Sequence, residues 1–397
     1  MDYSTLTQNL AQDADGVLID VHSLYAYFLR LVDRRGRRGR CYALALILVA
    51  IGLAKLGGED KPSGIAQGVR HRKELLIEVF ALKHQRMPAH NTYRRVLRQG
   101  VGLEDLDRVI TAYLQTWPEV GATTRISLDG KTLRGTIAYG ETRGLHLLAA
   151  YLPGQGVTLF QVAVDVKENE IVAAPKVLKL LDLQGKIVTG DALFTQRALS
   201  LLIVTAKGHY VWTVKANQPQ LRQDIELLFQ PEKCVPGFSP APKDFRTAQT
   251  LNTGHGRIEK RTLTTSSLLN ETCDWPGLGQ VFKLERDITL VGPQTKREEV
   301  VYGITSLTAT QAGPRQLLEI VREHWDQENG LHYRRDVTLK EDASRFTDWT
   351  VAEAMAMINN LVLALLLRGG KDNAAQERRY YAAHPDEALK CLITAPA

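Results

Sequence analysis

The spacing of apolar residues predicts a helical first part of the chain. Four segments before residue 101 have helical character, separated by Pro62, Pro88 and short basic stretches. Gly100 follows the last segment at the position expected for a C-terminal cap. We therefore expect residues 1–120 to form a helical N-terminal domain, with helices over residues 21–32, 41–56, 64–80 and 90–100.

After Thr123 the spacing of apolar residues becomes typical of β-strands. Strand-like segments at 124–130, 145–152, 157–164, 186–192 and 209–216 are interspersed with helical segments at 174–184 and 195–208. Three strands followed by helix, strand, helix and strand predict a mixed sheet with helices on its faces. Residues 220–305 have β-type patterning with many turns, which indicates an inserted β-rich unit. From Pro314 onwards the pattern is helical again.

Positive charge is concentrated in the N-terminal part. The 397-residue chain is 44% hydrophobic and 24% charged, with a formal net charge of +6. Fifteen Lys and Arg residues stand against four acids between Arg34 and Arg98. Such a region favours a polyanionic partner, most simply nucleic acid, although a solvated basic face remains an alternative.

Cysteine usage and hydropathy point to a soluble intracellular protein. The residues Cys41, Cys234, Cys273 and Cys391 are far apart and form no zinc-binding spacing. The apolar stretch 41–54 is shorter than the ~20 residues of a membrane span. We expect free thiols, no membrane association and a cytoplasmic location.

The segment "SLDGKTLRG", residues 127–135, ends like a phosphate-binding loop at Gly130-Lys131-Thr132. Such a loop needs a glycine five residues before that Gly, so that backbone N–H groups can wrap a phosphate. Arg125 occupies this position, which excludes the nucleotide-binding interpretation. Asp129 is instead an acid at the end of a strand.

Two other acids, Asp191 and Glu328, also stand at positions where a carboxylate could have a function. Asp191 follows an apolar strand directly before a helix, and Glu328 lies on a predicted helical face with His324 and Arg335. Three converging carboxylates require a cation, and hard oxygen ligands suit Mg²⁺, with Mn²⁺ as a substitute. Two such ions serve in-line phosphoryl transfer. The alternative is that the two aspartates form turns and the glutamate forms a surface ion pair.

Five ordered motifs resemble the DDE transposases of bacterial insertion sequences, in the branch of the H-repeat-associated proteins. They are "SLDGKTLRG", "VKENEIVAAPKVLKLLDLQGKIVTGDALFTQ", "YVWTVKANQPQL", "HGRIEKR" and "REHWDQENGLHYRRDVTLKEDASR". The resemblance covers most of the chain from about residue 30 to 390.

The resemblance implies a ribonuclease-H-like α/β fold with Asp129, Asp191 and Glu328 as the catalytic, metal-binding triad. It implies a DNA-binding N-terminal domain at 1–120, a catalytic core at 121–220, an inserted β-rich subdomain at 221–310 and C-terminal helices of the core at 311–397. The related Tyr-x2-Arg-x3-Glu-x6-Lys signature keeps only its glutamate here, because Val321, His324 and Arg335 replace the other three residues. Candidate DNA-binding residues are Arg37, Arg38, Arg40, Lys131, Arg134, Lys215, Asn217, His324 and Arg335.

The function implied by the resemblance is transposition. The protein would bind the terminal inverted repeats of its element, cleave the DNA to 3′-OH ends and join these to target DNA. Its partners would be double-stranded DNA and a second copy or more of itself, in the cytoplasm at the nucleoid. Two rivals remain: a domesticated DNA-binding protein without catalysis, and a simple metal-dependent nuclease.

Overall fold

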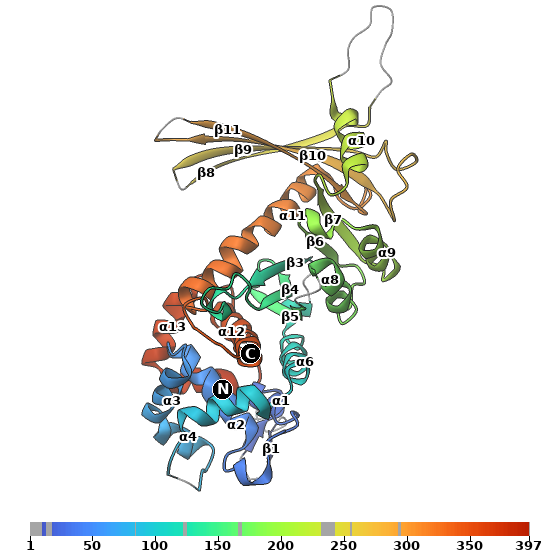
Figure 1. Cartoon of the computed structure of the whole chain (residues 1–397). Helices are drawn as coiled ribbons and strands as arrows, with labels where there is room; N and C mark the ends of the chain where they lie inside the picture. Colours follow the sequence, from blue (N-terminus) through green and yellow to red (C-terminus); the bar gives the residue numbers. More distant parts are fainter. Residues whose placement is uncertain are drawn as a thin grey trace, which may run out of the picture. The chain divides into compact units, whose positions relative to one another are not determined.

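A computed structural model describes residues 10–12, 18–83, 85–121, 125–165, 169–231, 243–254, 256–292 and 295–396 (Figure 1). Within it the chain forms two compact units. The first unit comprises Met1–Thr123, Gly130–Val164 and Glu328–Ala397, and the second comprises Thr124–Asp129 and Asp165–Gln327. The strand that begins at Arg125 thus passes from the second unit into the first.

The N-terminal part of the first unit is helical, as predicted. A short hairpin of β1 (Leu10–Gln12) and β2 (Leu18–Asp20) precedes the helices. Helix α2 is buried along its whole length, which explains why its sequence is apolar on every face. The helices are α1 (Leu24–Phe28), α2 (Leu44–Leu56), α3 (Pro62–His71), α4 (Lys73–Val79), α5 (His90–Arg95), α6 (Leu103–Leu114) and α7 (Pro118–Gly121).

Two details differ from the predicted helices. The segment expected to be one helix over 64–80 is divided at Arg72 into α3 and α4. Gly100 does not follow a helix end as a cap, because it is the last residue of a π-helix, η2 (Val96–Gly100), that continues α5.

The C-terminal helices complete the first unit. They are α12 (Trp349–Leu367), α13 (Ala374–Ala383) and α14 (Pro385–Ile393). By length and composition alone α12 could cross a membrane, but 89% of its most apolar window is buried inside the protein. Strand β5 (Val157–Val164) and helix α6 both pack against α12. This helix is therefore the centre of the unit's core.

A tight hairpin joins β4 (His146–Leu152) to β5. Its turn contains Gly154 and Gly156, which both have positive φ angles. A Cβ atom on Gly156 would lie 2.4 Å from the side chain of Leu367 in α12. Glycine is therefore required there for conformation and for close packing.

The second unit is built on parallel and antiparallel strands. β3 (Arg125–Thr132) pairs in parallel with β6 (Ile187–Gly190), and β6 with β7 (His209–Val214). The antiparallel strands β8 (Arg246–Gly254), β9 (Arg257–Ser266), β10 (Gln280–Leu290) and β11 (Lys296–Thr305) extend the sheet from β7. The helices of this unit are α8 (Glu170–Leu178), α9 (Arg197–Thr205), α10 (Pro219–Phe229) and α11 (Pro314–Gln327).

The strand order is β5-β4-β3-β6-β7-β11-β10-β9-β8. An antiparallel pair on one side of β3 and two parallel strands on its other side give the ribonuclease-H-like arrangement, so the predicted fold class is confirmed. Residues 220–305 were predicted to be β-type throughout. This is wrong for their first residues, because α10 extends to Phe229.

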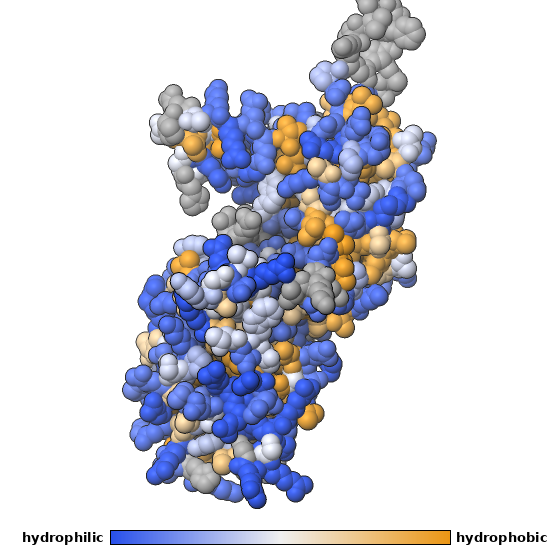
Figure 2. Space-filling model, in the orientation of Figure 1, coloured by the Kyte–Doolittle hydropathy of each residue, from blue (hydrophilic) through white to orange (hydrophobic). Residues whose placement is uncertain are grey.

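Helix α11 packs on the sheet through one apolar face. Leu317, Leu318 and Val321 form a buried cluster with Phe282 and Leu284 of β10. Elsewhere on this unit, apolar side chains gather on the visible surface around α9 and α10 (Figure 2). Leu201 and Leu227 belong to the exposed apolar residues of these two helices.

Cys41, Cys273 and Cys391 are free thiols, in agreement with the sequence analysis. Cys234 lies outside the described residues.

Candidate active site

Asp129 and Asp191 occupy matching places on neighbouring parallel strands. In the register of β3 and β6, Ser127 is opposite Thr189, and each aspartate follows two residues later. Because side chains alternate along a strand, Asp129 of β3 belongs to the same face as Ser127, whereas Asp191 directly follows the last residue of β6. Parallel strands lie about 4.8 Å apart, so the backbone carries both acids past the registered pair towards the carboxyl edge of the sheet, where α/β sheets bind ligands.

Asp191 also begins a 3-10 helix, η4 (Ala192–Phe194). Its Oδ1 accepts a hydrogen bond from the backbone N–H of Leu193 at 2.9 Å. Burial raises the pKa of Asp191, and the carboxylate of Glu170 adds to the rise, whereas His324 and Lys215 oppose it. The surrounding protein thus disfavours an isolated negative charge at Asp191, and a cation bound there would restore it.

His324 joins helix α11 to both strands that carry the aspartates. Its Nδ1 lies 2.7 Å from Oγ of Ser127 and 3.2 Å from Oγ1 of Thr189. Both hydroxyl-bearing residues are buried. The last turn of α11 is therefore fixed over the two strands, at positions two residues before the acids.

The residues beside His324 strengthen this attachment. Glu323 forms an ion pair with Arg125 of β3. On the other side, the guanidinium of Arg286 in β10 lies 4.5 Å from the ring centroid of Trp325. Arg286 also pairs with the buried Glu259 of β9 at 2.8 Å, so the β-rich strands contribute to holding the end of α11.

Glu328, the third predicted acid, follows α11 directly and opens the π-helix η5 (Glu328–His332). Its side chain lies outside the described residues. Among the side chains that are described, no group of three His, Cys, Asp or Glu residues is arranged to hold a metal. Oxygen ligands from the two aspartates nevertheless match the preference of Mg²⁺ and Mn²⁺.

The loop after β7 supports the loop that carries Asp191. Nδ2 of Asn217 donates a hydrogen bond to the carbonyl of Ala192 at 2.6 Å, and Nε2 of Gln218 donates to that of Thr195 at 2.9 Å. Lys215 is exposed. Of the two residues predicted here to bind DNA, Lys215 is accessible to a polyanion, whereas the amide of Asn217 connects two loops.

The α-helical periodicity that predicted a shared face for His324, Glu328 and Arg335 does not continue as far as Arg335. Two π-helices, η5 and η6 (Arg334–Thr338), interrupt the helix after Gln327, and their wider turns change the spacing on which that face depended. Only 1% of the Arg335 side chain is exposed, and its Nε and Nη2 donate to the carboxylate of Glu341 at 2.9 and 3.0 Å. The expectation of a DNA-contacting Arg335 is therefore contradicted in this conformation.

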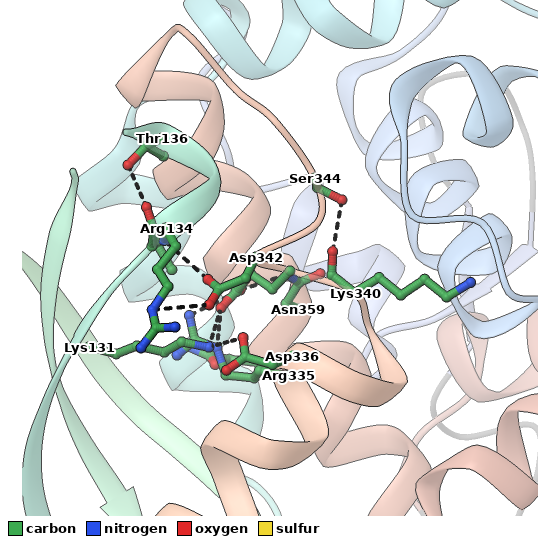
Figure 3. Close-up of polar contacts among 12 residues, drawn as sticks. Lys131, Arg134, Thr136, Arg335, Asp336, Lys340, Asp342, Ser344 and Asn359 are labelled. Atoms are coloured by element: carbon green, nitrogen blue, oxygen red, sulfur yellow. Dashed lines mark hydrogen bonds and ion pairs between the residues drawn. The ribbon is translucent and has the colours of Figure 1, made fainter. Parts of the chain in front are cut away.

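Lys131 belongs to the same buried network (Figure 3). Its ammonium forms an ion pair with Asp336 and lies 3.2 Å from Glu341. Asn359 of α12 donates a further hydrogen bond to Glu341 at 2.7 Å. These partners hold the pKa of Glu341 at about 2, with Arg335 the strongest of them, although burial opposes the shift. The network fastens the end of β3 to the segment after the π-helices.

The importance of Glu341 was missed by sequence reasoning. It lies in "TLKEDASR", within a motif quoted for the resemblance, but pattern alone does not reveal that the acid is buried. The neighbouring Asp342 accepts a hydrogen bond from the backbone N–H of Arg134 at 3.1 Å (Figure 3). A Cβ atom on Gly135 would lie 2.3 Å from the carbonyl oxygen of Ser344, so this glycine permits the close approach of the two segments.

The other predicted DNA-binding residues differ in accessibility. Arg37, Arg38 and Arg134 are exposed, whereas Arg40 is partly engaged through its bond to the carbonyl of Arg35. His324 contacts the sheet as described above and so acts within the protein.

Comparison with known proteins supports these features. Residues 121–365 match the transposase DDE domain, and residues 25–114 match the DDE_Tnp_1-associated domain. The chain is 29% identical to the putative transposase YncI of Escherichia coli O157:H7, over 94% of this chain and 95% of that protein. It is also 29% identical to the H repeat-associated putative transposase YhhI of Escherichia coli K12, over 65% of this chain and 70% of that protein.

An uncharacterized protein encoded in the dhlA 3′ region of Xanthobacter autotrophicus is 31% identical, over 70% of this chain and 91% of that protein. The likeness to a solved piggyBac transposase synaptic complex with hairpin DNA is too distant to bear on the site, with a TM-score of 0.39, 12% identity and coverage of 94% of this chain and 80% of that one. Because the transposase DDE domain matches well over half of the sequence, the chain belongs to the DDE transposase family.

Proposed function

We propose that the protein is a magnesium-dependent transposase that binds the terminal inverted repeats of its element, cleaves them to 3′-OH ends and joins these to target DNA. The observation that carries the proposal is that Asp129 and Asp191 each follow by two residues the registered pair Ser127 and Thr189 of adjacent parallel strands, to which His324 fixes helix α11. Membership of the DDE family supports the same reaction class.

In this proposal Asp129, Asp191 and Glu328 hold the divalent ions. Bound Mg²⁺ would activate the attacking hydroxyl and neutralise charge on the leaving oxygen. The chain's own residues position these ligands. His324 fixes the helix that precedes Glu328, and the capping bond to Leu193 fixes Asp191. Because phosphoryl transfer depends mostly on positioning and charge neutralisation, small displacements of these side chains would be costly.

The basic N-terminal domain would bind the element ends, with Arg37, Arg38 and Arg40 as contacts, and Arg134 and Lys215 would contact DNA beside the catalytic core. Two ends must meet for joining, so we propose a homodimer or larger assembly on DNA. We further propose a cytoplasmic, nucleoid-associated location. The proposed DNA contacts are supported by the positive charge of these segments and by the exposure of their side chains.

The decisive experiment incubates the full chain with a labelled element end, with and without Mg²⁺, and then with a pre-cleaved end and a target plasmid. Asp129→Asn and Asp191→Asn should each abolish cleavage and joining while DNA binding persists. Asp182→Asn, an exposed acid before β6, is the matched control and should retain activity. Cleavage by Asp129→Asn at the wild-type rate would refute the assignment.

Two other outcomes would favour the rivals. Binding without any Mg²⁺-dependent cleavage would indicate a domesticated DNA-binding protein. Cut DNA without a joined product would indicate a nuclease.

A further inference from the structure

A cavity of about 580 Å³ lies inside the first unit, whereas Asp129 and Asp191 belong to the second unit. It is formed where the beginnings of α3 and α5 meet the segment from Ala343 to Val351, which leads into α12. Its lining therefore combines the basic N-terminal domain with the chain that follows the buried Glu341 network.

Cations dominate this lining. Lys61, Arg94 and Arg345 are all exposed at the cavity, and His90 adds a fourth group that can become positive. Among the described lining residues Asp348 is the only acid, so the positive charges outnumber the negative ones.

The charge of Asp348 is already used within the protein. Its Oδ2 lies 2.8 Å from Nε of Arg98, and its Oδ1 accepts hydrogen bonds from the backbone N–H groups of Thr350 and Val351 at the start of α12. The cavity therefore keeps a net positive charge, and an anion is the complementary ligand.

Helix α3 adds to the positive electrostatic potential of the cavity. It begins with Pro62, and within the described part of the chain no side chain caps its N-terminus. Ser63, in the first turn, is exposed at the cavity. Partial positive charge from uncapped backbone N–H groups thus joins the charge of the side chains.

The phenyl ring of the lining is not free to stack on a base. Phe346 supplies its one phenyl ring, but this ring packs against a buried apolar cluster that contains Leu133 and Leu147. The exposed cations of the lining suit phosphate groups, as in sequence-independent binding of duplex DNA.

We propose that this cavity binds backbone phosphates of duplex DNA and holds the DNA through the N-terminal domain and the segment before α12 together. The inference rests on the proposed function in taking DNA as the partner. It adds a binding site made of Lys61, Arg94 and Arg345, none of which is a proposed metal ligand.

The test measures binding of the full chain to a fluorescent duplex by anisotropy, in the absence of divalent metal and over a range of salt concentrations. Arg94→Ala and Arg345→Ala should each weaken binding about fivefold near 0.15 M salt, and each should lower the slope of log K against log salt by about 0.9. The loss should be equal for duplexes of unrelated sequence. Arg95→Ala is the control, because Arg95 is an exposed neighbour on α5 that does not line the cavity.

A second variant separates binding from folding. Ser63→Glu places a carboxylate in the first turn of the uncapped helix α3, where negative charge favours the helix. We expect unchanged or slightly higher resistance to urea, together with weaker DNA binding. A variant that loses DNA affinity without losing stability cannot owe that loss to misfolding.

Equal DNA affinity of wild type, Arg94→Ala, Arg345→Ala and Ser63→Glu would overturn the proposal. Displacement of the duplex by dAMP at constant ionic strength, but not by the same concentration of inorganic phosphate, would also overturn it in favour of a nucleotide site. If wild type itself fails to bind any duplex, the proposed function fails as well. Binding by wild type and cavity variants alike would refute only this inference.

Discussion

Nδ1 of His324 lies 2.7 Å from Oγ of Ser127, two residues before Asp129. The same nitrogen is 3.2 Å from Thr189, two residues before Asp191. One imidazole thus connects α11 to both strands that lead to the proposed metal ligands. Because its hydrogen bonds go to the strands rather than to the acids, we propose that His324 is a positioning residue, in addition to the effect of its charge on the pKa of Asp191.

We expect His324→Ala to reduce Mg²⁺-dependent cleavage by about 10- to 100-fold, the usual effect of losing a group that orients metal ligands. The readout that identifies positioning is the Mg²⁺ concentration for half-maximal cleavage, which should rise. His324→Asn, whose amide can reach the same hydroxyls, should recover part of the activity. Glu319→Ala, on an exposed part of α11, is the control. An unaltered Mg²⁺ dependence in His324→Ala would contradict the positioning role.

Removal of the charge on Glu341 should destabilise the first unit strongly. This carboxylate is buried and is contacted by Arg335, Lys131 and Asn359. Glu341→Gln would leave buried cations without their counter-charge, which costs about 3–5 kcal/mol in the free energy of unfolding. Urea unfolding monitored by circular dichroism measures the loss. Asp342→Asn, at the adjacent half-buried position, should cost far less, and equal losses in the two variants would refute the network's importance.

The same carboxylate predicts a dependence on acid pH. The pKa of Glu341 in the folded protein is about 2, below the ordinary value of 4.5. The unfolded chain therefore binds the proton first, so the stability from this group is complete above about pH 4.5 and is lost as the pH falls towards 2. The difference in unfolding free energy between wild type and Glu341→Gln should shrink over this range. A constant difference from pH 6 to pH 3 would contradict the depressed pKa.

Secondary-structure elements were predicted accurately where the signal lies within the segment itself. The segment predicted as a strand over 157–164 is β5 residue for residue, because its flanking turn is marked by Gly154 and Gly156. Asp129 and Asp191 were each predicted to end an apolar strand. Asp191 does follow β6 directly, but the prediction is wrong for Asp129, because β3 continues beyond it to Thr132.

Other features depend on tertiary contacts and could not be read from spacing. Arg335 was placed on the face of Glu328 by α-helical periodicity, but two π-helices change that periodicity. Its partner Glu341 is buried only because α12 and the end of β3 enclose it. Likewise, nothing in the pattern around His324 identifies Ser127, which is almost 200 residues away, as its partner.

The burial of Lys55 predicts that the stability of the protein depends on pH in the alkaline range. Its side chain is 1% exposed inside the first unit, and its Nζ lies 3.5 Å from Oδ1 of Asp60. Burial lowers the pKa of Lys55 to about 8, and the charge of Arg378 contributes, although Asp60 opposes the shift.

The sign of the effect follows from proton binding. Between pH 8 and the ordinary value of 10.5, the unfolded chain keeps the proton that the folded protein has released, so stability from this group rises with pH. Relative to Lys55→Met, which cannot titrate, wild type should gain on the order of 2 kcal/mol of unfolding free energy between pH 7 and pH 10. Urea unfolding at several pH values measures this difference. Lys179→Met, at an exposed lysine, should show no such trend. If the unfolding free energy of wild type relative to Lys55→Met stays constant or falls as the pH rises, Lys55 keeps its proton inside the folded protein.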